Sequence, residues 1–267
     1  MKFKIGVCQP LITVNRDENI KNAFKAVESA ADMGAKAVLL PEIFTVPYTR
    51  RYVRNFPEAD GSLIKEMGEL AKKKGIYFFA GTIPEAEGEK IYNTCFIYNP
   101  KGEIIGKYRK MHLFDTELEG LNFKESLLFE SGNTPLVLDT ELGKIGVAVC
   151  FDIRFAEYMV SIGLKGVNLI MVPSEFGIQT GGSHWQILAR LRALDAQAYF
   201  AGAISARNPD GPFIAYGHSV ITDPWGDIVG ELDEKEGVLV REIDTENVKR
   251  IRKGFPLLKG RKPELYL

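Results

Sequence analysis

Asn99-Pro100-Lys101-Gly102-Glu103-Ile104-Ile105-Gly106 recurs in modified form as Asp223-Pro224-Trp225-Gly226-Asp227-Ile228-Val229-Gly230. A β-rich run precedes each copy at the same offset, Tyr92 to Tyr98 in the first and Tyr216 to Thr222 in the second. In the first copy, proline presets the first turn dihedral and glycine permits the last, so this segment predicts a β-hairpin. The sequence therefore predicts two hairpins with one plan.

A second pair of similar segments lies upstream of the hairpins. Val38-Leu39-Leu40-Pro41-Glu42-Ile43-Phe44 parallels Ile170-Met171-Val172-Pro173-Ser174-Glu175-Phe176, and each predicts a buried strand that ends at a proline. Coincidence in a chain rich in Val, Ile and Gly is the alternative, but two matches in the same order favour duplication. The sheet of each half must bury an apolar face, so the two sheets should stack with helices outside them. We expect an α/β fold, a four-layer αββα sandwich with an internal pseudo-twofold repeat.

Strands and helices alternate in the N-terminal part of the chain. A strand is predicted from Phe3 to Val7, and apolar residues at helical spacing predict a helix from Asp17 with a stop at Gly34. The elements expected next are a strand from Ala37 to Leu40, a helix capped by Ser62 that ends before Gly75, and a strand from Ile76 to Ala80.

Composition indicates a globular protein, and we expect one domain over residues 1–267. Of the 267 residues, 45% are hydrophobic and 26% are charged, which supplies enough apolar material for a large core. The net charge of -1 offers no basic stripe for nucleic acid or an anionic membrane, so we expect neither partner. The chain begins in a strand pattern and has no apolar run of membrane-spanning length, which predicts a cytoplasmic protein. Three cysteines and three histidines without paired spacing predict neither disulfides nor a metal site, and no cofactor is expected.

Two strand ends carry charged candidates for catalysis. Glu42 follows Leu39-Leu40-Pro41, where an apolar layer would raise the pKa of the carboxyl toward that of a general base; the alternative is a solvated surface residue. Lys110 lies at the end of the first hairpin, in a cluster of basic residues whose alternative interpretation is a solvated face. Strand alternation places Tyr108 and Lys110 on one side and Lys107 and Arg109 on the other.

Cys150 is the third candidate. The apolar strand 144–149 leads into it, and a helix start is predicted at 151–157. This order predicts a nucleophile elbow, in which a sharp turn exposes the thiol and the first N–H groups of the helix favour a thiolate and donate to an oxyanion. The alternative is a buried structural cysteine, which is the interpretation given to Cys8 and Cys95.

Together these segments resemble the nitrilase, or carbon–nitrogen hydrolase, superfamily. Its three signature segments are similar to Pro41-Glu42, to Tyr108-Arg109-Lys110-Met111-His112-Leu113 and to Cys150-Phe151-Asp152-Ile153-Arg154-Phe155. The similarity covers essentially the whole chain, and it is greatest with Nit2-type ω-amidases at Gly81-Thr82-Ile83-Pro84-Glu85, Tyr92-Asn93-Thr94-Cys95 and Phe155-Ala156-Glu157. The sequence departs from the common pattern at Phe151, where tyrosine is more usual, and at Ser174-Glu175, which replace small residues.

The resemblance implies a catalytic triad of Glu42, Lys110 and Cys150. Glu42 would be the base, Cys150 the nucleophile, and Lys110 with a backbone N–H near Phe151 would stabilise the oxyanion. Glu125 matches a second acid of the family that would orient Lys110 or the substrate amide; a charge in a polar loop is the alternative.

The resemblance also implies which residues contact the substrate. Arg154 would bind the distal carboxylate of a dicarboxylic monoamide, although an ion pair with Asp152 or Glu157 is the alternative. Phe176 and Thr180, on the loop after the Val172 strand, match positions that close over the substrate, and Phe151 adjoins the nucleophile.

The implied function is a cofactor-free amidase that acts on ω-monoamides of four- and five-carbon dicarboxylates, such as 2-oxoglutaramate, 2-oxosuccinamate or succinamate. Alternatives are an amidase for another carboxylate-bearing amide, such as deaminated glutathione or an N-carbamoyl compound, and a non-catalytic binding or scaffold protein of the same fold. The apolar tail at residues 255–267 matches family tails that cross a dimer interface, which implies a homodimer or a higher homo-oligomer. A tail that folds back on its own domain is the alternative.

Overall fold

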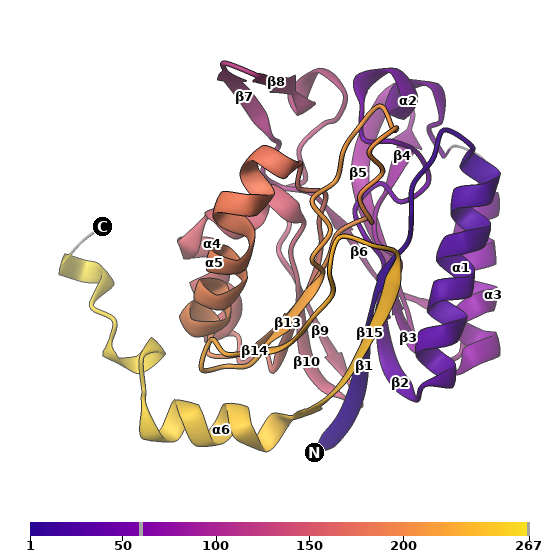
Figure 1. The fold of residues 1–267 in the computed structure, drawn as a ribbon. Helices are drawn as coiled ribbons and strands as arrows, with labels where there is room; N and C mark the ends of the chain where they lie inside the picture. The colour runs from indigo at the N-terminus through magenta and orange to yellow at the C-terminus, as the bar shows by residue number, and fades with distance from the viewer. Residues whose placement is uncertain (59–60, 266–267) are drawn as a thin grey trace.

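The computed structural model describes residues 1–58 and 61–265, and its main body has two β-sheets packed face to face (Figure 1). The first sheet has the order β15 (Gly237–Asp244), β1 (Lys2–Gln9), β2 (Ala35–Leu39), β3 (Tyr77–Phe79), β5 (Lys90–Tyr98) and β4 (Ile83–Glu87), with β6 (Ile104–Arg109) also paired to β5. The second sheet has the order β14 (Ile228–Glu231), β13 (Val220–Thr222), β12 (Tyr199–Ala203), β11 (Leu169–Pro173), β10 (Gly143–Val147) and β9 (Leu136–Thr140). A separate hairpin joins β7 (Asp115–Leu118) to β8 (Leu121–Lys124).

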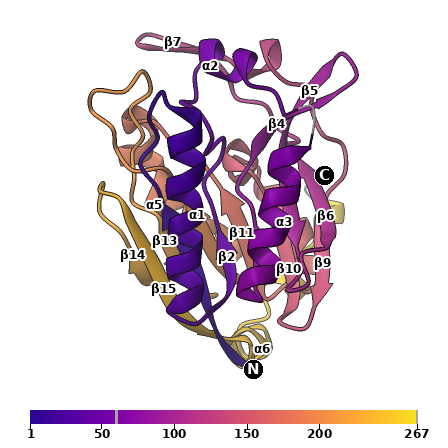
Figure 2. The same ribbon diagram turned by 90° about the vertical axis from the view of Figure 1, so that its right-hand side faces the viewer.

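Helices cover the outer face of each sheet, which confirms the four-layer αββα sandwich (Figures 1 and 2). The first sheet carries α1 (Arg16–Asp32) and α3 (Ser62–Lys74), and the second carries α4 (Ala156–Leu164) and α5 (Ile178–Ala196). The remaining described helical segments are α2 (Arg50–Asn55), α6 (Thr245–Gly254) and the 3₁₀ turns η1 (Glu125–Leu127), η2 (Cys150–Arg154), η3 (Leu258–Gly260) and η4 (Pro263–Leu265).

The two halves share one topology, as the repeated segments predict. In the first half β1, β2 and β3 are parallel and are followed by antiparallel β5 and β6; in the second half β10, β11 and β12 are parallel and are followed by antiparallel β13 and β14. The hairpin turns also match, because the side-chain oxygens of Asn99 and Asp223 each accept N–H bonds from the residues two and four positions later. The duplication is therefore visible in the backbone.

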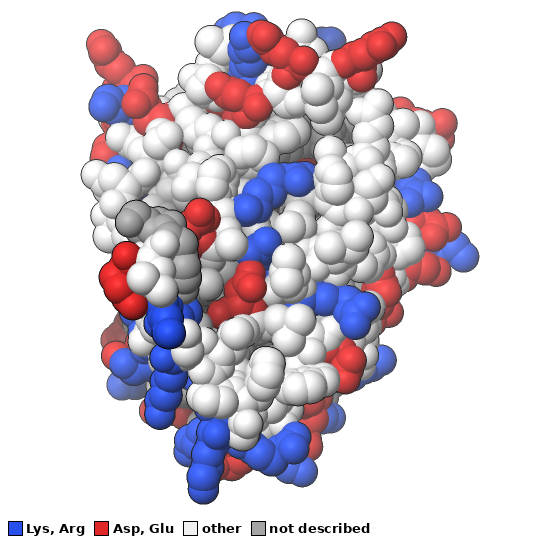
Figure 3. Space-filling view, turned by 90° about the vertical axis from the view of Figure 1, so that its left-hand side faces the viewer, with Lys and Arg blue, Asp and Glu red and all other residues white. Residues whose placement is uncertain are grey.

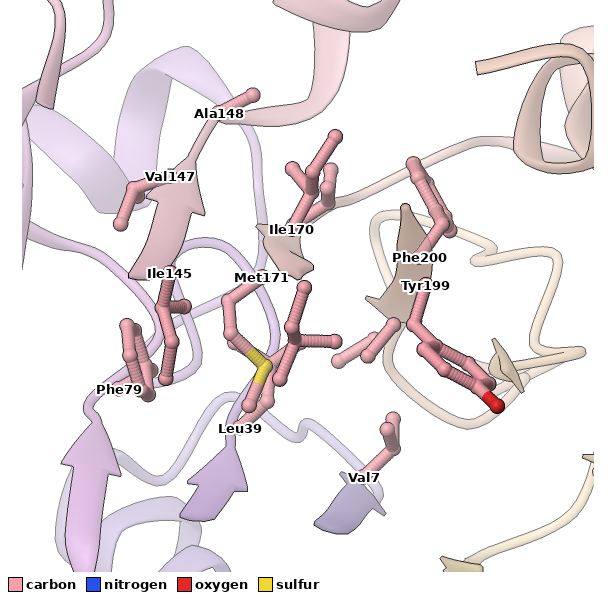
Figure 4. Packing of buried hydrophobic residues seen from close by; sticks show 14 of the residues in the cluster. Val7, Leu39, Phe79, Ile145, Val147, Ala148, Ile170, Met171, Tyr199 and Phe200 are labelled. Atoms are coloured by element: carbon pink, nitrogen blue, oxygen red, sulfur yellow. The ribbon is translucent and has the colours of Figure 1, made fainter. Parts of the chain in front are cut away.

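Apolar side chains from both sheets interlock between them. Val7, Leu39 and Phe79 of the first sheet face Ile145 and Met171 of the second, and all of them are completely buried (Figure 4). The alternate residues of the first sheet, including Cys8, Val38, Leu40 and Phe78, pack instead against α1 and α3. Strand periodicity thus divides each strand between an inter-sheet core and a core beneath the helices.

Two local predictions are wrong. Ser62 does not cap α3 but is its first residue, because Gly61 occupies the capping position with a left-handed φ of 74°. The run from Tyr216 to Thr222 is a strand only from Val220, because Gly217 and His218 both have positive φ and turn the chain before the ladder begins. Within the described residues, no helix combines the length and apolar character needed to cross a bilayer.

The turn between β5 and β6 gives a test of the packing against α3. Gly102 has φ +79° and a Cβ there would lie 2.4 Å from the Gly68 carbonyl oxygen, whereas Gly88 has φ +62° and open space around it. Gly102→Ala should therefore lower the free energy of unfolding by about 2 to 5 kcal/mol, against about 1 to 2 kcal/mol for Gly88→Ala. Urea denaturation measures both, and equal losses would show that the α3 contact does not constrain this turn.

Candidate active site

Four charged or reactive side chains from separate segments meet at one end of the sandwich. Glu42 follows β2, Lys110 follows β6, Glu125 begins η1 and Cys150 begins η2. Lys110 Nζ lies 2.9 Å from Glu42 Oε1 and 2.8 Å from Glu125 Oε2, and the three side chains are completely buried. The structure thus places together the residues that the sequence predicts as a catalytic group.

Glu42 is buried at the contact between the two halves of the repeat, so the solvated alternative is wrong. Its backbone N–H donates to the carbonyl of Ser174, the residue at the equivalent position of the second half (3.3 Å). Burial raises the pKa of the Glu42 carboxyl, and the negative charge of Glu125 adds to this shift while Lys110 opposes it. A carboxylate with a raised pKa is a better proton acceptor than a solvated one.

Lys110 faces the interior, and its neighbours on the same strand alternate as predicted. Tyr108 is completely buried, whereas Lys107 and Arg109 reach the outer side and pair with Glu85. Burial opposes the charged form of Lys110, but the carboxylates of Glu125 and Glu42 outweigh it and hold the pKa of the ammonium above its ordinary value. Two of the three N–H groups of the ammonium are used by these carboxylates, which leaves one for a ligand.

Two residues of this group were missed by the sequence analysis. Asn93 Nδ2 donates to Glu42 Oε1 (2.7 Å) and to Glu125 Oε1 (3.1 Å), and the Tyr48 hydroxyl donates to Glu125 Oε1 (2.5 Å). Asn93 had a detectable signal, because it is an amide in the middle of a strand that consists mainly of apolar and aromatic residues. Tyr48 lies in an irregular loop before α2 and had none. Both side chains hold the two carboxylates around the lysine.

Cys150 stands on a sharp turn, in agreement with the predicted elbow. Its φ is +43°, a left-handed conformation that non-glycine residues rarely adopt, and the 3₁₀ turn η2 begins at this residue. Asp152 fixes the turn: its carboxylate accepts hydrogen bonds from the Val149 N–H (2.8 Å), the Tyr108 hydroxyl (2.7 Å) and the His112 N–H (3.0 Å). The strained backbone is therefore held by a buried acid two residues beyond it.

The expectation that the elbow favours a thiolate is wrong. Burial raises the pKa of the Cys150 thiol well above its ordinary value, and the negative charge of Glu42 raises it further, although Lys110 opposes the shift. The thiol is 8% exposed and donates to the backbone oxygen of Glu175 (3.9 Å). Cys150 therefore rests as a protonated thiol next to a carboxylate that can take its proton.

A cavity of about 700 Å³ opens in front of Cys150. The residues predicted to contact substrate all line it: Phe151, Arg154, Phe176 and Thr180. Thr180, however, lies in the first turn of α5 and not on a loop. Glu175 also lines the cavity, and it was not among the predicted site residues.

Arg154 has no carboxylate partner among the described residues, so the ion pair with Asp152 or Glu157 is not formed. Asp152 is occupied by the elbow, and the Arg154 guanidinium instead contacts His184 Nδ1 (3.3 Å). Its Cζ lies 5.6 Å from the Phe151 ring centroid and 5.4 Å from that of Phe176. A planar cation without an anionic partner at a cavity wall can bind a carboxylate through two parallel hydrogen bonds.

Glu125 is not a charge in a polar loop, because it is buried and bonded to Lys110.

Across residues 1–58 and 61–265, no group of three or more His, Cys, Asp or Glu side chains is arranged to hold a metal ion.

Comparison with known proteins identifies the family of the chain. The family model described as carbon-nitrogen hydrolase matches residues 4–253. The chain belongs to the carbon–nitrogen hydrolase family. It is therefore an enzyme that hydrolyses amide C–N bonds, and the resemblance to the nitrilase superfamily is confirmed.

Similar proteins of this family are matched over nearly their full length. Omega-amidase NIT2 of Xenopus tropicalis is 38% identical over 99% of this chain and 97% of its own length, and omega-amidase NIT2 of Homo sapiens is 35% identical over 99% and 96%. The crystal structure of Saccharomyces cerevisiae Nit3, a member of branch 10 of the nitrilase superfamily, matches with a TM-score of 0.89 and 35% identity, covering 98% of this chain and 97% of that one.

The three cysteines allow a direct test of the elbow. Burial raises the pKa of all three thiols, but Cys150 lines the cavity and has the acceptor Glu42 beside it, whereas Cys8 and Cys95 are completely buried in the core. Iodoacetamide should therefore label Cys150 at least about tenfold faster than the others and abolish amidase activity. Peptide mapping of early time points, with urea-unfolded protein as the control for intrinsic reactivity, measures this. Early labelling of Cys8 or Cys95, or full activity in Cys150→Ala, would contradict the assignment.

Proposed function

We propose that this carbon–nitrogen hydrolase is an ω-amidase, which releases ammonia from short dicarboxylic monoamides such as 2-oxoglutaramate, 2-oxosuccinamate or succinamate. The observation that carries the proposal is the Arg154 guanidinium, which has no acidic partner and lines the same cavity as the Cys150 thiol. A substrate that fits must have an amide at one end and an anion at the other. The relatives named omega-amidase support this substrate class.

We propose that the first half-reaction forms a thioester. Glu42 takes the thiol proton as the Cys150 sulfur attacks the amide carbon, so the carbonyl oxygen gains the negative charge. The free N–H of Lys110 and the backbone N–H of Phe151 then stabilise this oxyanion. Glu42 returns its proton to the amide nitrogen as the C–N bond breaks, and ammonia leaves. Glu125 remains paired with Lys110 and keeps the ammonium oriented.

In the second half-reaction, water takes the place of the thiol as the nucleophile. Glu42 takes a proton from a water molecule as the water oxygen attacks the thioester carbon. Lys110 again stabilises the oxyanion. When the C–S bond breaks, the sulfur recovers the proton from Glu42 and the carboxylic acid product is released. One buried carboxylate is sufficient for both steps because it is neutralised and regenerated in each.

Two alternatives to the ω-amidase proposal are an amidase with a different substrate and a non-catalytic scaffold. An amidase for deaminated glutathione or an N-carbamoyl compound would also use Arg154, so only relative rates on such substrates distinguish it. A non-catalytic scaffold would need the loss of a reactive group, but Glu42, Lys110 and Cys150 are all present and in place.

Arg154→Lys tests the proposed carboxylate contact. A lysine point charge cannot reproduce a bidentate fork, so kcat/KM should fall roughly 10- to 100-fold on succinamate but less than about threefold on uncharged short amides. Ammonia release measured on monoamides, carbamoyl acids and uncharged amides tests this difference and the substrate class together. Equal losses on charged and uncharged amides would assign Arg154 a structural role, and faster turnover of carbamoyl acids would replace the ω-amidase proposal.

We also propose that the protein forms a homodimer through the face that carries α4 and α5. Uncharged side chains cover most of this face (Figure 3). Exposed apolar side chains on or near its helices include Leu164 (55% exposed) and Ile187 (66%). The start of the tail docks on its own subunit, because Gln197 binds the Phe255 backbone (2.6 Å), whereas Leu265 near the end is 72% exposed. The predicted tail extends to Tyr266 and Leu267, which lie outside the described residues.

Ile187→Glu should weaken the proposed dimer, because a charge would face the apolar patch of the second copy. Lys101→Glu, a charge change on the distant hairpin turn, is the control. Light scattering at micromolar concentration should give about 60 kDa for the wild type and for the control, by doubling the 29.8 kDa chain, and a lower mass for Ile187→Glu. A monomeric wild type would contradict the dimer, and an unchanged mass for Ile187→Glu would place the interface elsewhere.

A further inference from the structure

Glu175 is a buried acid at the cavity that the reaction steps above do not use. It follows β11, is 8% exposed, and lines the same cavity as Cys150 and Arg154. Its backbone oxygen accepts the Cys150 thiol hydrogen bond, and the ring of the next residue, Phe176, lies 5.4 Å from Arg154 Cζ. The Glu175 backbone therefore lies beside the nucleophile, and the next residue along the chain lies beside the cation proposed to bind the far end of the substrate.

No basic side chain among the described residues forms an ion pair with the Glu175 carboxyl. Its Oε2 accepts a hydrogen bond from the Ser205 backbone N–H (3.2 Å). Lys110 is engaged by Glu42 and Glu125, and Arg154 contacts His184. A buried carboxylate without a counter-ion is costly, so this site favours the neutral acid.

Burial and the charge of Glu42 favour the same neutral state of Glu175. Burial raises the pKa of Glu175 to about 8, the negative charge of Glu42 adds to the shift, and the Ser205 hydrogen bonds oppose it. The other titratable residues that line the cavity are Tyr48 before α2, Arg50 in α2, Lys124 in β8, and Cys150 and Arg154 in η2. Burial raises the pKa of the Cys150 thiol and the Tyr48 hydroxyl, which keeps both uncharged near neutral pH. None of the three cations forms an ion pair with Glu175 in the described part of the chain.

A neutral carboxyl and a carboxylate recognise different substrates. The neutral acid carries one O–H that it can donate to an acceptor oxygen, whereas a carboxylate accepts from an ammonium. Between its amide and its distal carboxylate, a dicarboxylic monoamide can carry an oxo oxygen, an ammonium group or only methylene hydrogens. The protonation state of Glu175 therefore bears on which substituent this cavity accepts.

We infer that Glu175 is a further substrate-contacting residue, which donates a hydrogen bond to an acceptor oxygen on the substrate chain and so selects 2-oxo monoamides over their 2-amino and unsubstituted counterparts. This inference rests on the proposed ω-amidase function and deepens it. Arg154 recognises the carboxylate that all three substrates share. Glu175 distinguishes the substituents on the carbon that lies between that carboxylate and the amide.

The experiment compares kcat/KM for three five-carbon monoamides that carry a 2-oxo group, a 2-amino group or only hydrogens at that carbon. In the wild type at pH 7 the 2-oxo substrate should exceed the unsubstituted one by roughly five- to tenfold, the effect of one net hydrogen bond in a buried site. Glu175→Gln keeps a donor and should keep this ratio, whereas Glu175→Ala should bring it to about one. Circular dichroism and thermal unfolding verify that each variant is folded.

A pH series separates Glu175 from the other titrating groups. The wild-type ratio of 2-oxo to unsubstituted kcat/KM should fall as the pH rises through about 8, because the carboxyl loses its donor proton. Titration of Glu42 and Cys150 affects both substrates and cancels in the ratio. In Glu175→Gln the ratio should be independent of pH, since an amide does not titrate there.

Each remaining outcome overturns a defined claim. A ratio that Glu175→Ala leaves unchanged, or a wild type that prefers the 2-amino substrate, would overturn the inference while leaving the ω-amidase proposal standing. Hydrolysis of none of the three monoamides, with turnover of a different amide, would overturn the proposed function and with it the inference.

Discussion

The buried ion pair of Lys110 with Glu42 and Glu125 is the constraint on which the rest of the site depends. An ammonium removed from water is stable in a protein interior only when nearby anions and hydrogen bonds compensate for the lost solvation. Here two carboxylates do so, and the Asn93 amide donates a hydrogen bond to one oxygen of each. Removing one partner of such a group typically lowers the free energy of unfolding by ~3 to 5 kcal/mol. The same contacts that set the geometry of the site therefore stabilise the fold.

The duplicated sandwich explains how residues so distant in sequence reach this point. Parallel strands of each sheet end at the same edge, and the stacked sheets bring the end of β2 beside the end of β11. The equivalent positions of the two halves have diverged, with Glu42 in one and Ser174 in the other. One half therefore supplies the proposed base and the other the proposed nucleophile, and segments of both halves line the cavity. The architecture is symmetric, but the chemistry is not.

Patterns of short range predicted most of the fold and the core of the site. The repeated hairpin turns, the buried strands and the positions of Glu42, Lys110 and Cys150 follow from periodicity, turn residues and family resemblance. Tyr48 could not be found in this way, because its role comes from a contact with Glu125, which lies in a different part of the chain. The raised pKa of Cys150 was also unpredictable, since the burial and the Glu42 charge that cause it arise only in the folded structure.

Because the site is divided between the halves, two fragments of the chain would have to associate before either could take part in catalysis. A chain cut between η1 and β9 would leave the proposed proton acceptor Glu42 on one piece and the Cys150 sulfur on the other, so the proposed proton transfer would cross from one polypeptide to another. Neither piece alone could carry out a turnover, and each would expose the apolar sheet face that its counterpart normally covers. Amidase activity recovered on mixing would thus report reassembly of the two sheets.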